Sequence, residues 1–364
     1  MAEKHSRETD RDLVPRRGTL RAVLITLGLC GIGFIALYLL RSFATALLVI
    51  FAGVLFGVFL HGLSMLMADW LRLPRRVALT LAVLLLVACA AGFIWLAGPE
   101  VVQQGEVLVQ QLPRSIAFLQ TQLQRFEWGR AFLASLPPLN QFQFSLASIL
   151  GSVTQAFSIT AEIIGVLLFV FFVGLYLAAT PETYLGGILR LFSREHHARY
   201  RQVFAALGLA LRWWLLGRAV TMTLMGILTT LALWLADVPL ALVLGVIAGL
   251  LLFVPYLGAV AAAIPAMLVA FMQSPTKALW VAAIYTGVHV FEGYFITPYV
   301  QKRAVALPPA LLLSVQILSA ALFGIMGVIF STPLTVVAIV LIQTLYVQDV
   351  LGEEVAVLGE HEPK

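Results

Sequence analysis

The sequence predicts an all-α integral membrane protein with two broken or re-entrant helical hairpins and a small helical extracytoplasmic domain. Of its 364 residues, 61% are hydrophobic and 11% are charged, whereas a soluble domain carries about 25% charged residues. Uncharged stretches of membrane length recur along the chain, because about 20 apolar residues cross a hydrocarbon core of about 30 Å. Counting these stretches gives about seven or eight transmembrane helices.

The N-terminal part predicts a cytoplasmic tail and three membrane spans. Residues 1–19 are polar and contain five Lys or Arg, so the positive-inside rule places the N-terminus in the cytoplasm. Residues 20–97 are expected to hold transmembrane helices one to three, with a hinge at Arg41-Ser42. Gly53 and Gly57 form a GxxxG pair in the second span, which lets another helix approach closely.

Residues 98–150 change character and predict the extracytoplasmic helical domain. Pro99 is expected to end the third span, and seven glutamines follow between Gln103 and Gln124. Apolar residues spaced by four and three positions indicate an amphipathic helix whose seam is either an oligomer contact or packing within one chain. The seam residues are Leu112, Ile116, Leu119, Leu123 and Phe126.

Residues 151–180 are expected to form transmembrane helix four, with Glu162 near its outer end. Residues 181–218 return to positive charge and predict an amphipathic helical segment on the cytoplasmic interface, anchored by Trp213 and Trp214. Its six arginines are Arg190, Arg194, Arg199, Arg201, Arg212 and Arg218.

Residues 219–347 are expected to form a transmembrane core with two interrupted stretches. Leu240–Met272 follows a turn at Asp237 and carries no charge. A single helix of this length would measure about 50 Å, too long for one ordinary crossing. Pro255, Gly258 and Pro265 interrupt this stretch. Leu311–Val347 is likewise uncharged and is interrupted by Gly324, Gly327 and Pro333.

Between these two stretches lies Val281–Arg303, an apolar segment with a histidine and a glutamate. His289 and Glu292 are three residues apart and share a helix face. An ionisable residue in hydrocarbon costs roughly 2.5–3.5 kcal/mol, which makes Glu292 a functional hypothesis. Pro298 then interrupts the helix, and Lys302 marks a cytoplasmic end. If Lys302 lies on the cytoplasmic side, each interrupted stretch enters and leaves the membrane on the same side, as a re-entrant loop or as two crossings.

Several motifs in the second half of the chain point to one family. They are Phe253-Val-Pro-Tyr-Leu-Gly258, Phe291-Glu292-Gly293, Thr297-Pro298, Leu322-Phe-Gly324-Ile-Met-Gly327 and Thr332-Pro333. With these motifs, the chain resembles the AI-2E family of predicted permeases, named for an autoinducer-2 exporter, over most of residues 15–350. The family's Glu-Gly pair maps to Glu292 and Gly293, and its Pro-x-x-Gly pair maps to Pro255 and Gly258.

The resemblance implies a multi-pass protein of the bacterial inner membrane. The positive-inside rule and a second hairpin at Leu311–Val347 predict that both termini, including the acidic tail at residues 348–364, are cytoplasmic. The resemblance also implies a homo-oligomer, a pentamer by family resemblance, and transport of a small polar solute such as a signalling molecule. Protons or Na⁺ are the candidate coupling ions. A Na⁺/H⁺ antiporter and a non-transporting membrane scaffold remain open as alternatives.

Interrupted helices at membrane depth form solute and ion sites in secondary transporters. We therefore expect the pathway to include Glu292, Pro255, Gly258, Pro265, Gly293, Pro298, Gly324, Gly327 and Pro333. The candidate modulators are His289, Glu162 and Asp237. We expect no enzyme activity, catalytic residue, metal or cofactor, since the H-E-x-x-H and Walker A motifs are absent from the sequence. The basic residues form no stripe that favours nucleic acid.

Overall fold

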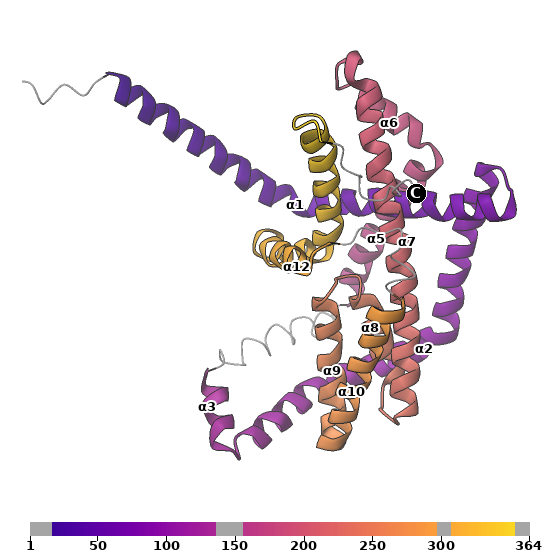
Figure 1. Ribbon diagram of the computed structural model, residues 1–364. Helices are drawn as coiled ribbons and strands as arrows, with labels where there is room; N and C mark the ends of the chain where they lie inside the picture. The colour runs from indigo at the N-terminus through magenta and orange to yellow at the C-terminus, as the bar shows by residue number, and fades with distance from the viewer. Residues whose placement is uncertain (1–16, 136–155, 297–306, 354–364) are drawn as a thin grey trace, which may run out of the picture. The chain divides into compact units, whose positions relative to one another are not determined.

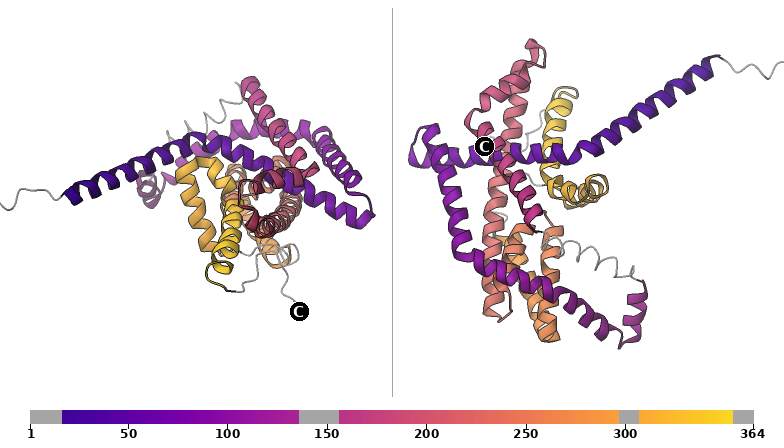
Figure 2. Two further views of the ribbon diagram at one scale, coloured as in Figure 1. Left: turned by 90° about the horizontal axis from the view of Figure 1, so that it is seen from above. Right: turned by 180° about the vertical axis from the view of Figure 1, so that it is seen from behind.

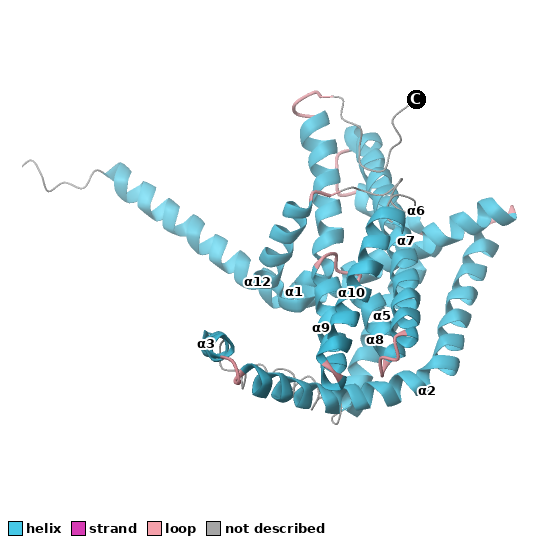
Figure 3. Cartoon of the chain, turned by 60° about the horizontal axis from the view of Figure 1, so that its bottom comes forward, coloured by secondary structure: helices cyan, strands magenta, loops and turns pink. Residues whose placement is uncertain are grey.

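The computed structural model describes residues 17–135, 156–296 and 307–353 (Figure 1). These residues form helices and short connections, without a strand among them (Figure 3). The chain divides into two compact units after Leu48, and every side-chain contact reported below lies within the second unit. Of the expected features, Pro298, Lys302 and Arg303 lie outside the described residues.

The helices keep the labels of Figure 1. They are α1 (Arg17–Leu71), α2 (Arg75–Leu123), α3 (Glu127–Ser135), α5 (Ala156–Ala179), α6 (Pro181–Leu189), α7 (His197–Leu235), α8 (Ala241–Leu251), α9 (Leu257–Gln273), α10 (Pro275–Phe291) and α12 (Pro309–Leu341). A 3₁₀ turn, η1 (Arg194–His196), precedes α7. Two π-helical turns, η2 (Glu292–Ile296) and η4 (Ile342–Gln348), follow α10 and α12.

By length and composition, five helices in the described residues can cross a membrane, and a bent pair can form a sixth span. The bent pair consists of Ile163–Ala179 and Pro181–Leu189, at an angle of 85°. The all-α membrane class is thus confirmed. This number leaves out residues 17–42 of α1, as well as α8 and α9, which are shorter than the roughly 20 residues that a crossing needs, so it does not contradict the expected seven or eight.

Two helix ends expected from the sequence are absent. Helix α1 continues through Arg41-Ser42, where a hinge was expected. Helix α2 has 49 residues and continues through both Pro99 and Pro113. A proline removes one hydrogen bond of the helical ladder, and helices in membranes tolerate this loss when neighbouring groups compensate for it.

The second half of α2 packs against the chain's own core. Leu108 is buried in one apolar cluster with residues of α7, α8, α9 and α10, and Leu112 packs against this cluster. The Phe118 ring lies 6.0 Å from the ring of Phe271 in α9. Of the five seam residues, Leu112 therefore packs against the same chain, whereas Phe126 is exposed. Residues 136–155 of that domain lie outside the described residues.

The GxxxG pair forms a close helix contact. A Cβ placed at Gly57 would lie 3.0 Å from the backbone oxygen of Gly174 in α5, and one at Gly53 would lie 2.7 Å from Val173. Such distances leave no room for a side chain, so the glycines allow α1 and α5 to approach. The contact predicted from Gly53 and Gly57 is confirmed.

Helix α7 corrects the expected interfacial segment. It runs without a break from His197 to Leu235, across the boundary expected after Arg218. Trp214 is buried, in a cluster with residues of α1 and α12, and its ring packs edge-on against Phe253 at 5.6 Å. The apolar stripe predicted to meet lipid meets other helices instead, so Trp214 is not an interfacial anchor.

Helices α8 and α9 form a hairpin beside α7 and α10 (Figures 1 and 2). At its open end, Lys277 Nζ donates to the backbone oxygens of Ala236 and Asp237, at 2.7 and 3.0 Å. This bond joins the residues before α8 to those after α9, so Leu240–Met272 begins and ends on one side, as expected. At 11 and 17 residues, the two helices measure about 17 and 26 Å. These lengths fit a re-entrant hairpin better than two crossings.

The second interrupted stretch bends within α12. Gly324 has φ +63° and ψ −148°, a backbone conformation that is essentially restricted to glycine. A Cβ at Gly327 would collide with the carbonyl of Ser319, because the chain folds tightly at this bend. The backbone of this bend therefore explains why glycine occupies both position 324 and position 327.

Candidate ion and solute site

The tip of the α8–α9 hairpin is a strained turn. Tyr256 has φ +62° and ψ −61°, and Leu257 N donates to Pro255 O at 2.7 Å. These values define a γ-turn of the rare, strained type. A Cβ at Gly258 would collide with the carbonyl of Leu251, which explains the glycine at this position. Backbone strain of this kind is concentrated at functional sites.

Gln316 of α12 joins the second interrupted stretch to this turn. Its Nε2 donates to Pro255 O at 3.0 Å, and the residue is 0% exposed. Its Oε1 has no hydrogen-bond partner among the described residues. A buried acceptor without a partner is uncommon and calls for an explanation such as a bound ion, water or ligand. Sequence reasoning missed Gln316, although it is the only amide side chain between Leu311 and Leu341.

Glu292 begins the π-helical turn that follows α10. Its Oε2 lies 3.1 Å from His289 Nδ1, and the two side chains are 17% and 28% exposed, respectively. The expected pairing of positions three apart on one helix face is therefore present. π-Helical turns are rare and occur frequently at functional sites.

Arg218 is the second residue that sequence reasoning missed. It lies in α7, inside the candidate span Arg194–Leu235, and interacts electrostatically with Glu292 and Tyr256. The sequence pattern groups Arg218 with the cytoplasmic arginines, because it predicts a helix boundary directly after this residue. The available signal was its position: Arg218 is followed by 18 uncharged residues, up to Asp237.

The helix lengths place Arg218 and Glu292 at a similar depth. Arg218 lies 19 residues, or about 28 Å, before Asp237 on a continuous helix. Glu292 lies 15 residues, or about 22 Å, after Lys277. Asp237 and Lys277 are joined at the open end of the hairpin, so both distances are measured from one level. Arg218 and Glu292 therefore lie about 22 to 28 Å from the level of that junction, toward the other side of a hydrocarbon core of about 30 Å.

A cavity of about 310 Å³ adjoins Arg218. Arg218 is the only charged residue in its lining, which otherwise consists of apolar side chains from α1, α5, α7, α12 and the α8–α9 connection. A larger cavity, of about 790 Å³, lies along α7 and α8 and is lined without a charged residue.

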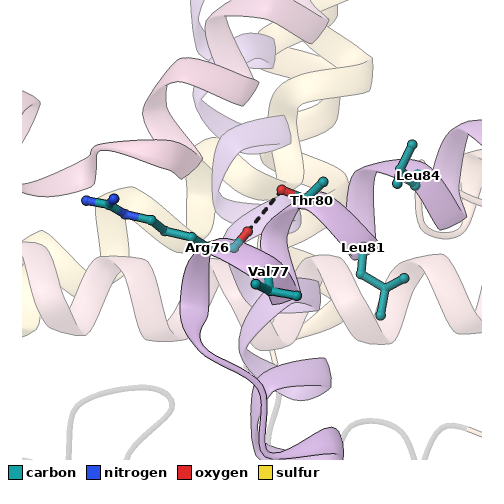
Figure 4. Close-up of a pocket in the computed structure, with 5 residues that line it drawn as sticks. All are labelled: Arg76, Val77, Thr80, Leu81 and Leu84. Atoms are coloured by element: carbon teal, nitrogen blue, oxygen red, sulfur yellow. Dashed lines mark hydrogen bonds between the residues drawn. The ribbon is translucent and has the colours of Figure 1, made fainter.

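The hollow shown in Figure 4 is a poor candidate. It is lined by Arg76, Val77, Thr80, Leu81 and Leu84, all from α2. The Thr80 hydroxyl donates to the Arg76 carbonyl at 3.0 Å. All five lining residues belong to one helix, and the Thr80 hydroxyl already has a hydrogen-bond partner within that helix.

The remaining expected residues are scattered. Asp237 is exposed at the other end of α7, about 28 Å along the helix from Arg218. Pro265 lies inside α9, and Pro333 is buried in the second half of α12. Gly293 is exposed next to Glu292, with open space where a Cβ would lie. The side chain of Glu162 is outside the described residues.

Among the described residues, no three His, Cys, Asp or Glu side chains gather as a metal site would require. The site instead combines a carboxylate, an imidazole, a guanidinium and an amide at the junction of two interrupted helical stretches. Such a group can exchange protons, bind small ions and donate hydrogen bonds to a polar solute.

Comparison with known proteins identifies the family. A family model described as AI-2E family transporter matches residues 24–347. This chain belongs to the AI-2E family of transporters. It is similar to "Putative transport protein YueF" of Bacillus subtilis, with 23% identity over 294 residues, covering 78% of this chain and 79% of that protein.

Two further relatives agree. "Putative transport protein YrrI" of Bacillus subtilis is 30% identical over 122 residues, covering 33% of this chain and 34% of the relative. A "Putative transport protein" of Synechocystis sp. is 24% identical over 278 residues, covering 72% and 77% of the two chains, respectively. With its apolar helices, this AI-2E family protein is a multi-pass membrane transport protein. The matched family is described as a family of transporters.

Proposed function

We propose that this AI-2E family protein is a secondary transporter of a small polar solute, and that Glu292 couples transport to protons or Na⁺. The observation that carries the proposal is the position of Glu292. It lies beside His289 and within electrostatic reach of Arg218, which also interacts electrostatically with Tyr256 of the strained turn. Secondary transporters bind solutes and ions where helices are interrupted at membrane depth.

The charge of Glu292 decides how strongly it attracts Arg218. The ionised carboxylate attracts the guanidinium and accepts a hydrogen bond from a protonated His289 Nδ1. A proton or a Na⁺ on the carboxylate removes this attraction. Arg218 belongs to a helix long enough to span the membrane and interacts electrostatically with Tyr256 at the hairpin tip. A change at Glu292 therefore alters the force between these two elements, which is the requirement for coupling an ion to a conformational change.

We further propose that the protein lies in the bacterial inner membrane with both termini in the cytoplasm. The arginine-rich start of α7 and the basic N-terminal residues support this orientation. The junction of Asp237 and Lys277 would then face the outside. The family resemblance favours a homo-oligomer, with a pentamer as the expected state.

The test is proton flux in proteoliposomes that contain a pH-sensitive dye. Addition of glycine, lactate or ribose should drive proton movement in the wild-type protein. Glu292→Gln keeps the shape of the side chain and removes its charge. Its flux should fall to the level of protein-free liposomes. Asp237→Asn, which neutralises an exposed carboxylate at the far end of α7, is the matched control and should behave as wild type.

The same assay separates the alternatives. Proton flux driven by Na⁺ without any solute would favour a Na⁺/H⁺ antiporter. If Glu292→Gln moved protons as the wild type does, Glu292 would have no coupling role.

A further inference from the structure

The connection between α1 and α2 lies at a membrane surface and is rich in arginine. Two candidate spans meet there, one ending at Leu71 and the other beginning at Arg75. The side chains of Arg72, Arg75 and Arg76 are exposed. Within twenty residues on either side of the connection, Asp69 is the only acidic residue. The connection therefore carries a net positive charge at the depth where lipid headgroups lie.

The turn itself is strained at an arginine. Arg72 has φ +54°, and Leu73 N donates to Ala68 O at 3.2 Å. This hydrogen bond closes the end of α1 in the manner of a Schellman motif, in which glycine usually occupies the residue with positive φ. Strained backbone is concentrated at functional sites. The tight turn also keeps Arg72 close to Arg75 and Arg76 at the start of α2.

A fourth arginine reaches the same place from α7. Arg212 Nη1 donates to Met65 Sδ of α1 at 3.4 Å, and Arg212 interacts electrostatically with Asp69. His61 of α1 interacts electrostatically with both Arg212 and Arg75. Charged groups of α1, α2 and α7 therefore meet at this end of the membrane domain, and arginine predominates among them.

The helix length places this group of charges at the membrane surface. Arg212 lies 25 residues before Asp237, or about 37 Å along the continuous helix α7. This distance exceeds the hydrocarbon core of about 30 Å, so Arg212 lies near the surface opposite Asp237. Trp70, beside the arginines, is 84% exposed, and tryptophan is enriched where membrane meets water.

Exposed apolar side chains continue from the arginines along α2. Val77, Leu81 and Leu84 are 49%, 37% and 60% exposed, respectively. In Figure 4, the side chain of Arg76 extends away from Leu81 and Leu84. The start of α2 thus presents a cationic end and an apolar flank, which matches a molecule with an anionic head and a hydrocarbon chain.

We propose that Arg72, Arg75 and Arg76 bind the headgroup phosphate of an anionic phospholipid. One acyl chain of this lipid lies along Val77 and Leu81. Guanidinium groups match phosphate oxygens with paired hydrogen bonds, and basic clusters next to a span recognise anionic headgroups. The apolar flank favours a lipid over free phosphate. This inference goes beyond the proposed transport function and does not depend on it.

The experiment compares two phospholipids with identical acyl chains. Full-length protein in a neutral detergent is titrated with phosphatidylglycerol, which is anionic, or with phosphatidylcholine, which is zwitterionic. The bound lipid is measured by native mass spectrometry. Because each arginine near an anionic headgroup should raise the affinity about fivefold, we expect phosphatidylglycerol to bind about tenfold more tightly or better.

The triple variant Arg72→Gln, Arg75→Gln, Arg76→Gln should reduce this preference to within about threefold. Its matched control is Arg190→Gln, Arg194→Gln, Arg201→Gln, which removes the same charge at three other exposed positions and should keep the preference. Should the first triple variant fail to fold, the single variants Arg72→Gln and Arg76→Gln provide the second test, each with an expected loss of about fivefold.

Four outcomes would overturn the proposal. Equal affinity for the two lipids would show that the headgroup charge is not recognised. An equal loss in both triple variants would assign the preference to the total charge of the protein. Displacement of phosphatidylglycerol by equimolar inorganic phosphate would assign the arginines to free phosphate. A tenfold gain in phosphatidylglycerol affinity after deletion of residues 354–364 would make that acidic segment their occupant.

Discussion

At the scale of single residues, Gln316 shows how one side chain connects two distant stretches. Its Nε2 donates to Pro255 O, which also accepts a hydrogen bond from Leu257 N. Removing the amide would therefore leave Pro255 O with a partner. It would also remove Oε1, a buried acceptor without a partner among the described residues.

We predict that Gln316→Leu changes stability little and transport strongly. The lost hydrogen bond is worth about 0.5–1.5 kcal/mol, and removal of an unsatisfied buried group offsets about as much. The thermal unfolding midpoint should stay within a few degrees of wild type, while proton flux should fall because the bend of α12 no longer holds the hairpin tip. Ser314→Ala, which removes an exposed hydroxyl bonded within its own helix, is the control. Wild-type flux in Gln316→Leu would contradict the prediction.

At the scale of helices, the break between α8 and α9 depends on Gly258. The γ-turn at Tyr256 sends the chain back so sharply that Gly258 lies against the carbonyl of Leu251. The bend at Gly324 follows the same principle by a different route, since there the backbone conformation itself excludes other residues.

Gly258→Ala should therefore destabilise the protein. A methyl group collides with backbone, and overpacking of this kind costs about 1–3 kcal/mol. Gly287→Ala is the matched control, because Gly287 lies in α10 with open space around it. An alanine there should stabilise the helix by about 0.5–1 kcal/mol. Thermal unfolding of both variants in one detergent is the measurement, and equal stability of the two would argue against the tight turn.

At the scale of the second compact unit, polar contacts tie the ends of long helices. Arg199, near the start of α7, donates to the backbone oxygen of Thr344 at 2.7 Å and pairs with Asp349 at 2.9 Å. At the far end of α7, Lys277 joins the two ends of the re-entrant hairpin. With 39 residues, α7 measures about 58 Å, more than a membrane thickness. These two groups of contacts should thus face opposite sides of the membrane.

Cysteine labelling tests this topology. With the native cysteines replaced (Cys30→Ser, Cys89→Ser), Lys277→Cys should react with a membrane-impermeant maleimide added outside intact cells. Glu353→Cys, beyond the Arg199 contacts, should react only after the cells are opened. Labelling of both positions from the same side would refute the re-entrant arrangement.

The sequence by itself determined the features that depend on local composition and spacing. The apolar stretches predicted the membrane class, Gly53 and Gly57 predicted a close helix contact, and the spacing of His289 and Glu292 predicted that they share a helix face. These properties follow from hydropathy and from the helical repeat, both of which can be read along one segment.

Only the tertiary structure decided what faces Glu292 and where the interrupted stretches meet. The position of Arg218 depends on α7 continuing through an expected boundary, and the bond from Gln316 to Pro255 joins residues 61 positions apart. Which cation lies near a buried carboxylate depends on how separate helices pack. A pattern within one helix cannot predict which cation lies near Glu292, because contacts between helices determine which side chains lie close together.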